Sequence, residues 1–299
     1  MLMRHWSLSP LLPLALVVAS VHALGLIRRS TAISRAHRPV WPWILQGLLF
    51  DIGLTLLVVA IDSPLDYYAG RFLTAHMLQH ILLGFGAPAL VALGAPWLPL
   101  MSGLPRGWRR RAGRVVQALR RWQRRARWTR HVTHPAVPIV GFNLAMVGWH
   151  FPAAYDLAHR NELVHIWLEH ASFFGLALLL WMQLVGSYPF RPVLPPLGQA
   201  SVAFATNVVM VGTAMTLVLF THDLYPVYHA VVGASLSQDA DQQIAGSVLW
   251  VCGEATLAPL IYYQLHRWLA AGERTATLMP TRGTAIVPRW RAATGRQWK

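Results

Sequence analysis

The feature that most constrains the fold of this chain is a series of apolar runs, each near the length that a helix needs to cross a bilayer. Seven runs approach or meet that length, at residues 10–27, 41–61, 74–100, 136–155, 162–185, 199–222 and 241–264. A hydrocarbon core of about 30 Å takes roughly 20 helical residues, and a single segment in lipid pairs its backbone groups internally only as a helix. Composition agrees, because 55% of the residues are hydrophobic and only 12% are charged. We predict an all-α, polytopic membrane helix bundle with seven transmembrane helices over residues 1–272, followed by a basic, loosely ordered tail over 273–299.

The basic residues predict the orientation of these helices. Of the 26 Lys and Arg, 23 lie in alternating segments, which are residues 28–40, 102–135, 186–198 and 267–299, and three lie in the opposite segments. The positive-inside rule therefore places the N-terminus outside and the C-terminus in the cytoplasm. One alternative stays open, because residues 4–24 resemble a cleavable secretory signal, and cleavage would reverse every later segment against this count.

The net charge of +15 comes mainly from segments between the apolar runs, so membrane topology explains it better than a nucleic-acid partner does. We expect the lipid membrane to be a partner and nucleic acid not to be one. The basic cytoplasmic loop 102–135 has Val115, Leu119 and Trp122 at helical spacing among many arginines. It fits a helix that lies on an anionic membrane surface and, equally, a solvated loop.

The third apolar run, 74–100, is longer than one span needs and contains Pro88 and Pro96. Proline lacks the amide donor of a helix and clashes with the preceding turn. We expect a kink or a break toward the far end of this run.

Histidines lie at the predicted outer ends of several spans, where a buried imidazole is costly unless it meets a partner or a cavity. In the stretch AHMLQH, His76 and His80 are four residues apart, so both rings lie on one helical face and can reach one ion. His150, in WHFPAAYD, lies near the outer end of the fourth run, and Asp241 begins the seventh. These positions predict a polar layer just below the outer surface, with His76, His80 and His150 as candidate metal ligands.

The stretch HIWLEH, near the start of the fifth run, adds His165, Glu169 and His170 to this layer. His165 and Glu169 share a helical face, which makes Glu169 a further ligand or a support for one. His165 and His170 are five residues apart and therefore about 140° around a regular helix. Both can reach one metal ion only if the helix is distorted there, or else a second site exists.

The donor types narrow the choice of metal. Imidazole suits copper, zinc, iron and nickel, while a thioether favours copper(I), and Met77 lies beside His76. The one cysteine, Cys252, lies inside an apolar run, so no cysteine-based zinc or iron–sulfur site is expected. On these grounds we expect copper as the bound metal, with zinc and haem as the alternatives.

Two carboxylates fall near the middle of the bilayer, Asp51 in the second run and Glu254 in the seventh. An ionisable residue at this depth indicates a function such as a proton relay, or else a protonated acid that is hydrogen-bonded to a neighbour. Asn207 and Gln183 are candidate polar partners for these acids.

Four stretches together resemble a known family. Residues 63–96, 149–156, 163–173 and 241–250 are similar, in order and spacing, to the seven-span CtaG-type cytochrome c oxidase assembly factors of bacteria. The resemblance implies a multi-pass protein of the bacterial cytoplasmic (inner) membrane that helps to mature a haem–copper oxidase by supplying or inserting copper on the outer side. It implies no turnover chemistry, hence no enzyme, and it implies oxidase subunits or other assembly factors as partners. The matching motif positions are His76, Met77, His80, His150, His165, His170, Asp241 and Gln242. Of these, we expect Met77, Asp241 and Gln242 to be either further ligands or residues that support the ligands.

Two other functions stay open from the residues themselves. A haem-binding membrane redox protein would use histidines of separate spans, but a haem needs an axial ligand on each side of the ring, and a pair on one helical face suits a small ion better. A metal or proton transporter would use Asp51 and Glu254, but few polar residues lie in the inner halves of the spans.

Overall fold

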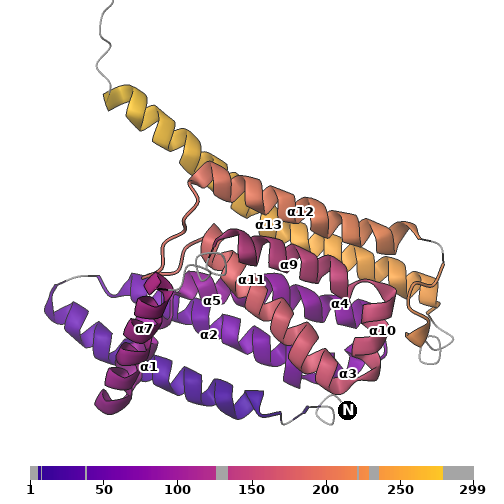
Figure 1. Ribbon diagram of the computed structural model, residues 1–299, viewed down its shortest axis with the longest axis horizontal. Helices are drawn as coiled ribbons and strands as arrows, with labels where there is room; N and C mark the ends of the chain where they lie inside the picture. The colour runs from indigo at the N-terminus through magenta and orange to yellow at the C-terminus, as the bar shows by residue number, and fades with distance from the viewer. Residues whose placement is uncertain are drawn as a thin grey trace, which may run out of the picture.

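The computed structural model describes residues 6–7, 9–37, 39–125, 134–220, 222–228 and 236–278 (Figure 1). The longer helices are α1 (Leu11–Arg35), α2 (Trp41–Asp62), α7 (Arg106–Arg125), α9 (Ala136–Trp149), α11 (Ala171–Leu184), α12 (Pro196–Leu219) and α13 (Gln238–Leu278). The shorter helices are α3 (Pro64–Ala69), α4 (Leu73–Ile81), α5 (Ala87–Gly94), α6 (Trp97–Gly103) and α10 (Pro152–Arg160). Two π-helices lie at Leu82–Gly86 and Val164–His170, and a 3-10 turn lies at Pro226–Tyr228. These described ranges contain no β-strand, so the predicted all-α fold is confirmed for them.

Among the described residues, six helical segments are long and apolar enough to cross a membrane, and a seventh forms if α9 and α10 count as one span. The chain is thus a multi-pass membrane protein. The predicted span 136–155 is not one continuous helix, because α9 ends at Trp149 and the helix axis turns by 80° into α10. Pro152 explains this break, since proline disfavours the α conformation in the residue before it, and Phe151 is accordingly extended.

The third apolar run forms the centre of the bundle. α4 passes through the first π-helix into α5, and 72% of this span is buried, against at most 33% of the others. α4 packs against α13, while α5 packs against α2 and α11. The predicted break is present at Ala95, which has a left-handed φ of 44° and precedes Pro96. The helix that carries His76 and His80 is therefore enclosed by protein rather than lipid.

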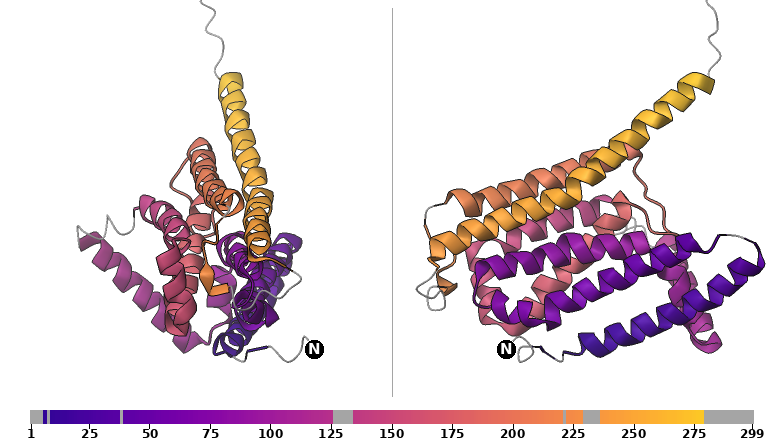
Figure 2. Two further views of the ribbon diagram at one scale, coloured as in Figure 1. Left: turned by 90° about the vertical axis from the view of Figure 1, so that its right-hand side faces the viewer. Right: turned by 180° about the vertical axis from the view of Figure 1, so that it is seen from behind.

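The basic segment after α6 lies across one end of the bundle. α7 covers Arg106–Arg125 and runs crosswise to the long helices in both figures (Figures 1 and 2). Within the loop 102–135 the structure shows a helix over this range, and the position of that helix on a membrane surface stays a prediction. Residues 126–133 lie outside the described residues. At the other end of the chain, α13 continues past the bundle to Leu278, and residues 279–299 of the predicted tail lie outside the described residues.

Candidate functional site

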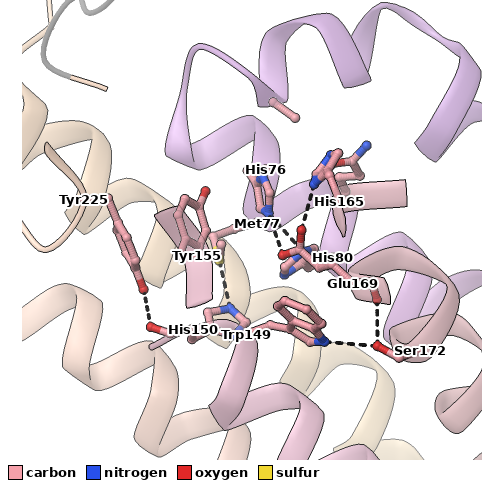
Figure 3. Close-up of polar contacts among 12 residues, drawn as sticks. His76, Met77, His80, Trp149, His150, Tyr155, His165, Glu169, Ser172 and Tyr225 are labelled. Atoms are coloured by element: carbon pink, nitrogen blue, oxygen red, sulfur yellow. Dashed lines mark hydrogen bonds and ion pairs between the residues drawn. The ribbon is translucent and has the colours of Figure 1, made fainter. Parts of the chain in front are cut away.

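Two histidines of α4 meet a glutamate of the second π-helix inside the bundle (Figure 3). The Nε2 atoms of His76 and His80 are 2.9 Å apart. They lie 3.5 and 3.2 Å, respectively, from the Oε1 atom of Glu169. All three side chains are buried, and their ligand atoms are close enough together to hold one metal ion. We call these three residues the α4 set; the pair predicted from AHMLQH shares one face and gains a carboxylate from another element.

The π-helix Val164–His170 brings His165 and His170 together, although they are five residues apart. Hydrogen bonds in a π-helix run between residues i and i+5, so side chains at that spacing lie near each other. The two ring centroids are 4.0 Å apart, and Nδ1 of His165 is 2.7 Å from Oε2 of Glu169. His165, Glu169 and His170 form a second ligand set, which we call the π set. Of the two alternatives that the spacing left open, a distorted helix or a second site, the distorted helix is present, and the two sets share one carboxylate.

His150 reaches the cluster from the break between α9 and α10. Its Nδ1 atom is 2.6 Å from the carbonyl oxygen of Met146, which only accepts, so Nδ1 donates and the Nε2 lone pair of the neutral ring is free. That Nε2 atom lies 3.3 Å from Sδ of Met77. The rings of His150 and His80 are 5.3 Å apart between centroids. A nitrogen and a thioether, both good copper(I) donors, therefore adjoin the α4 set.

Three buried nitrogen atoms of the cluster, Nδ1 of His80 and both ring nitrogens of His170, have no hydrogen-bond partner among the described residues. Buried polar atoms in proteins are nearly always paired, and an unpaired one calls for an explanation such as an ion or a water. The donor set of imidazoles, one carboxylate and one thioether is of the kind that binds transition-metal ions such as copper. It does not fit a haem between His76 and His80, because their Nε2 atoms leave one helical face and are 2.9 Å apart.

A pocket of about 300 Å³ joins this cluster to the surface of the protein. Its lining includes His76, His165, Asp66, His159 and Glu162. Asp66, in α3, accepts a hydrogen bond from Nε2 of Gln79 at 2.8 Å, and its Oδ1 atom is 4.0 Å from Nε2 of His165. Burial raises the pKa of Asp66 above the usual value for aspartate, against the lowering effect of the Gln79 hydrogen bond. The sequence did not mark Asp66 as a site residue, yet the pocket gives a cation a polar route to the buried ligands.

Asp241, near the start of α13, caps the helix that bears the two histidines of the α4 set. Its Oδ2 atom accepts a hydrogen bond from the backbone N–H of Leu73 at 2.7 Å. Its Oδ1 atom accepts from the backbone N–H of Thr74 at 3.2 Å and from the Thr74 hydroxyl at 2.6 Å. Of the two roles predicted for Asp241, ligand or support, the geometry favours support.

Gln242 has a similar supporting position beside it. Its Oε1 atom accepts from the backbone N–H of Leu224 at 3.0 Å, and its Nε2 atom donates to the carbonyl of Phe220 at 3.1 Å. These bonds fix the connection between α12 and α13 over the site, and they occupy the amide group that was predicted as a ligand or a support.

Replacing Asp241 by alanine should lower the free energy of unfolding by about 1–2 kcal/mol, the usual cost of losing a helix N-cap. In this variant the first amide groups of α4 would lose both acceptor oxygens. Asp241→Asn would keep one acceptor oxygen, so its free energy of unfolding should lie between those of the wild type and Asp241→Ala. Thermal unfolding in detergent measures the change, with the exposed Gln243→Ala in the same helix as control. Equal melting temperatures for Asp241→Ala and Gln243→Ala would contradict the capping role.

A comparison with known protein families matches residues 21–271 to the cytochrome c oxidase caa3 assembly factor family (Caa3_CtaG). The chain belongs to this family. Curated relatives include uncharacterized proteins of Mycobacterium leprae and Mycobacterium bovis, each 22% identical over 86% of this chain. The chain spans 39% of the length of these relatives. No solved structure matches the chain.

Membership in the Caa3_CtaG family confirms the resemblance that the four motifs indicated, and the matched range contains both ligand sets.

The two carboxylates that were predicted to lie near the middle of the bilayer pair with residues of neighbouring helices in this family member. Oδ1 of Asp51 is 3.1 Å from Nδ1 of His22, a buried residue of α1 that no sequence pattern marked. Glu254 accepts a hydrogen bond from Nδ2 of its predicted partner Asn207 at 2.9 Å. These pairs join α1 to α2 and α12 to α13, and neither acid belongs to the two ligand sets.

Three buried tyrosines also surround the ligands of this family member. The ring of Tyr155 lies 4.9 Å from that of His76 between centroids. Tyr225 donates its hydroxyl to the carbonyl oxygen of His150 at 2.6 Å, and the Tyr228 hydroxyl donates to a carbonyl of α3 at 3.0 Å. Tyr155 lies within WHFPAAYD, so that motif contained a signal for it. Tyr225 and Tyr228 come from the connection between α12 and α13, where no periodicity indicates burial.

Proposed function

We propose that this protein is a membrane assembly factor that binds copper through its histidine cluster and delivers or inserts it into a haem–copper cytochrome c oxidase. The oxidase role follows from the family, and the copper role is our inference from the donors. The observation that carries it is the pair of ligand sets that share Glu169, with unpaired buried nitrogens beside them. Copper is a cargo in this proposal, and the protein needs no turnover chemistry.

The shared carboxylate suits transfer of an ion better than permanent storage. An ion that enters through the pocket meets one histidine of each set there, because His165 of the π set and His76 of the α4 set both line the pocket. It can then exchange imidazoles of the π set for those of the α4 set while Glu169 stays bound. A bare cation in a low-dielectric interior is very unfavourable, so a path on which every lost ligand is replaced lowers the barrier to transfer.

His150 and Met77 support copper(I) over zinc as the cargo. Zinc prefers nitrogen, thiolate and carboxylate donors, while a thioether is a soft ligand that favours copper(I). Sδ of Met77 and the free Nε2 of His150 are 3.3 Å apart, close enough to bind one ion together.

We further propose that the cluster faces the outer side of the bacterial inner membrane, with the N-terminus outside and the C-terminus in the cytoplasm. The segment counts of 23 and three Lys and Arg support this orientation under the positive-inside rule. The arginine-rich α7 lies at the end of the bundle away from α3 and α10, which lie beside the cluster (Figure 1). Oxidase subunits or other assembly factors would then meet the cluster from the outer side.

Deletion of the gene tests the assembly role directly. We expect membranes of the deletion strain to contain oxidase with most of its copper missing, measured as copper per haem in the purified enzyme. A plasmid copy with His80→Ala should fail to restore the copper, whereas one with the exposed His266→Ala in α13 should restore it. Fully active oxidase with normal copper in the deletion strain would overturn the proposal.

Two measurements separate this proposal from the other functions. A Soret band in the absorption spectrum of the purified protein would favour a haem-binding redox protein. Copper uptake into proteoliposomes that disappears with Asp51→Asn would favour a transporter.

A further inference from the structure

Four arginines surround two adjoining pockets at the end of the bundle opposite to the histidine cluster. One pocket, of about 290 Å³, is lined by Arg28, Arg106 and Arg109. The other, of about 300 Å³, is lined by Arg28, Arg29 and Arg109. α1 supplies Arg28 and Arg29, while α7 supplies Arg106 and Arg109. We call these four residues the arginine site; it joins two elements that are far apart in the sequence.

The α1 side of the arginine site is fixed by contacts with neighbouring elements. Nη1 of Arg28 donates hydrogen bonds to the carbonyl oxygens of Ser102 at 2.8 Å and Gly103 at 3.0 Å. The guanidinium of Arg29 lies 4.6 Å from the ring centroid of Trp43. The Nε atom of Arg29 is buried and has no hydrogen-bond partner in the described ranges of the chain. Since a buried charged donor without an acceptor is unfavourable, this atom points to an acceptor from another molecule.

No carboxylate balances these charges within the elements that form the site. α1, α6 and α7 contain no Asp or Glu, and none of the described residues that line either pocket is acidic. Guanidinium groups repel one another unless an anion lies between them, and their strongest hydrogen bonds are the bidentate ones to phosphate or carboxylate. The arginine site therefore fits an anionic ligand.

The surface of α7 indicates where that anion comes from. Trp108, Ala112 and Val115 lie on one helical face, and Trp108 and Val115 are 62% and 57% exposed. α7 runs crosswise to the spans at the end of the bundle (Figure 2). An amphipathic helix in this position lies in the membrane interface, with its apolar side against the acyl chains. Its arginines then lie at the level of the phospholipid headgroups.

We infer that the arginine site binds the phosphate group of an anionic phospholipid. The phosphate would accept hydrogen bonds from guanidinium groups of both helices, so the lipid would tie α7 to α1. The exposed apolar side of α7 favours a lipid over free phosphate, because only a lipid also covers that side with acyl chains. This inference is independent of copper binding at the other end of the bundle.

The test uses the full-length protein in nanodiscs of phosphatidylcholine that contain a minor fraction of phosphatidylglycerol, with bound lipid titrated by native mass spectrometry. We expect Arg106→Gln/Arg109→Gln to weaken phosphatidylglycerol binding about thirtyfold, from the usual contribution of two basic residues at an anionic surface. Arg28 is left unchanged because it donates hydrogen bonds to α6 and so contributes to packing. Arg106 and Arg109 form no such hydrogen bond to the described residues of α6. The matched control, Arg111→Gln/Arg114→Gln, removes the same charge from the same helix outside both pockets, and Arg111 lies about 140° around the helix from Arg106.

The arginine site is supported if Arg106→Gln/Arg109→Gln weakens phosphatidylglycerol binding while the control variant binds this lipid like the wild type. Equal weakening of both variants would mean diffuse attraction by basic charge, and no weakening in either would mean no site, so both outcomes overturn the inference. Inorganic phosphate is the last arm of the test. If phosphate alone occupies the site and phosphatidylglycerol does not compete with it, the lipid is the wrong ligand.

Discussion

Replacing His76 and His80 together by alanine is expected to remove most of the copper that the purified protein binds. Their Nε2 atoms supply two of the three donors of the α4 set, and Glu169 alone cannot replace them. We expect the affinity for copper(I) to fall at least about 100-fold, since even groups that only support metal ligands cost up to that much when they are lost. Elemental analysis after equilibration with a limiting copper(I) complex measures the change.

Both histidines are buried, so the alanine variant needs a partner that preserves packing. His76→Gln/His80→Gln fills a similar volume and keeps hydrogen-bonding groups, but a side-chain amide is a poor ligand for copper(I). The exposed His266→Ala controls for the loss of a histidine as such. Wild-type copper content in either double variant, in protein that elutes as one species and keeps its helical circular dichroism, would contradict the α4 set as a metal site.

Local periodicity was enough to predict the parts of the site that lie on regular helix. His76 and His80 are four residues apart on α4, and the structure places their rings on one face as that spacing requires. The break after the third span also followed from local chemistry, because Pro96 cannot continue a helix and Ala95 takes a left-handed conformation before it.

Other parts depended on departures from regular helix that no spacing rule contains. In a regular helix with 3.6 residues per turn, His165 and His170 would lie about 140° apart around the axis. The π-helix instead brings their ring centroids to 4.0 Å. The 80° bend that places His150 beside Met77 likewise interrupts the predicted span 136–155. From the spacing alone we could infer that a shared site for His165 and His170 needs a distorted helix, but we could not infer that the helix is distorted.

Contacts between distant segments account for the rest of the difference. Asp241 caps α4 across 168 residues of chain, and Asp66 joins the cluster from a short helix outside the spans. Such contacts depend on how the helices pack around the central span. The local sequence around Asp241 or Asp66 therefore does not predict which distant residue it contacts. This is also why Asp241 was expected as a ligand or a support without a choice between the two.

Glu169→Gln is the single substitution expected to weaken copper binding most, because Glu169 is the only residue that belongs to both ligand sets. The amide keeps the size of the side chain but removes the negative charge that balances a cation in a buried site. We expect affinity for copper(I) to fall about 100-fold or more, and to fall further than with His165→Ala, which removes one imidazole from the π set alone. Titration against a competing copper(I) chelator gives both values.

Glu254→Gln is the matched control for this change, since Glu254 is also an acid within a span but pairs with Asn207 and not with the cluster. If the shared carboxylate carries the ion between the two sets, Glu169→Gln should also slow the release of copper to an acceptor protein at equal occupancy, while His165→Ala should leave a residual path through the α4 set. A Glu169→Gln protein that binds and releases copper as Glu254→Gln does would show that the two sets act without a common ligand. The buried carboxylate would then serve only to hold His165, whose Nδ1 atom lies 2.7 Å from it, in place.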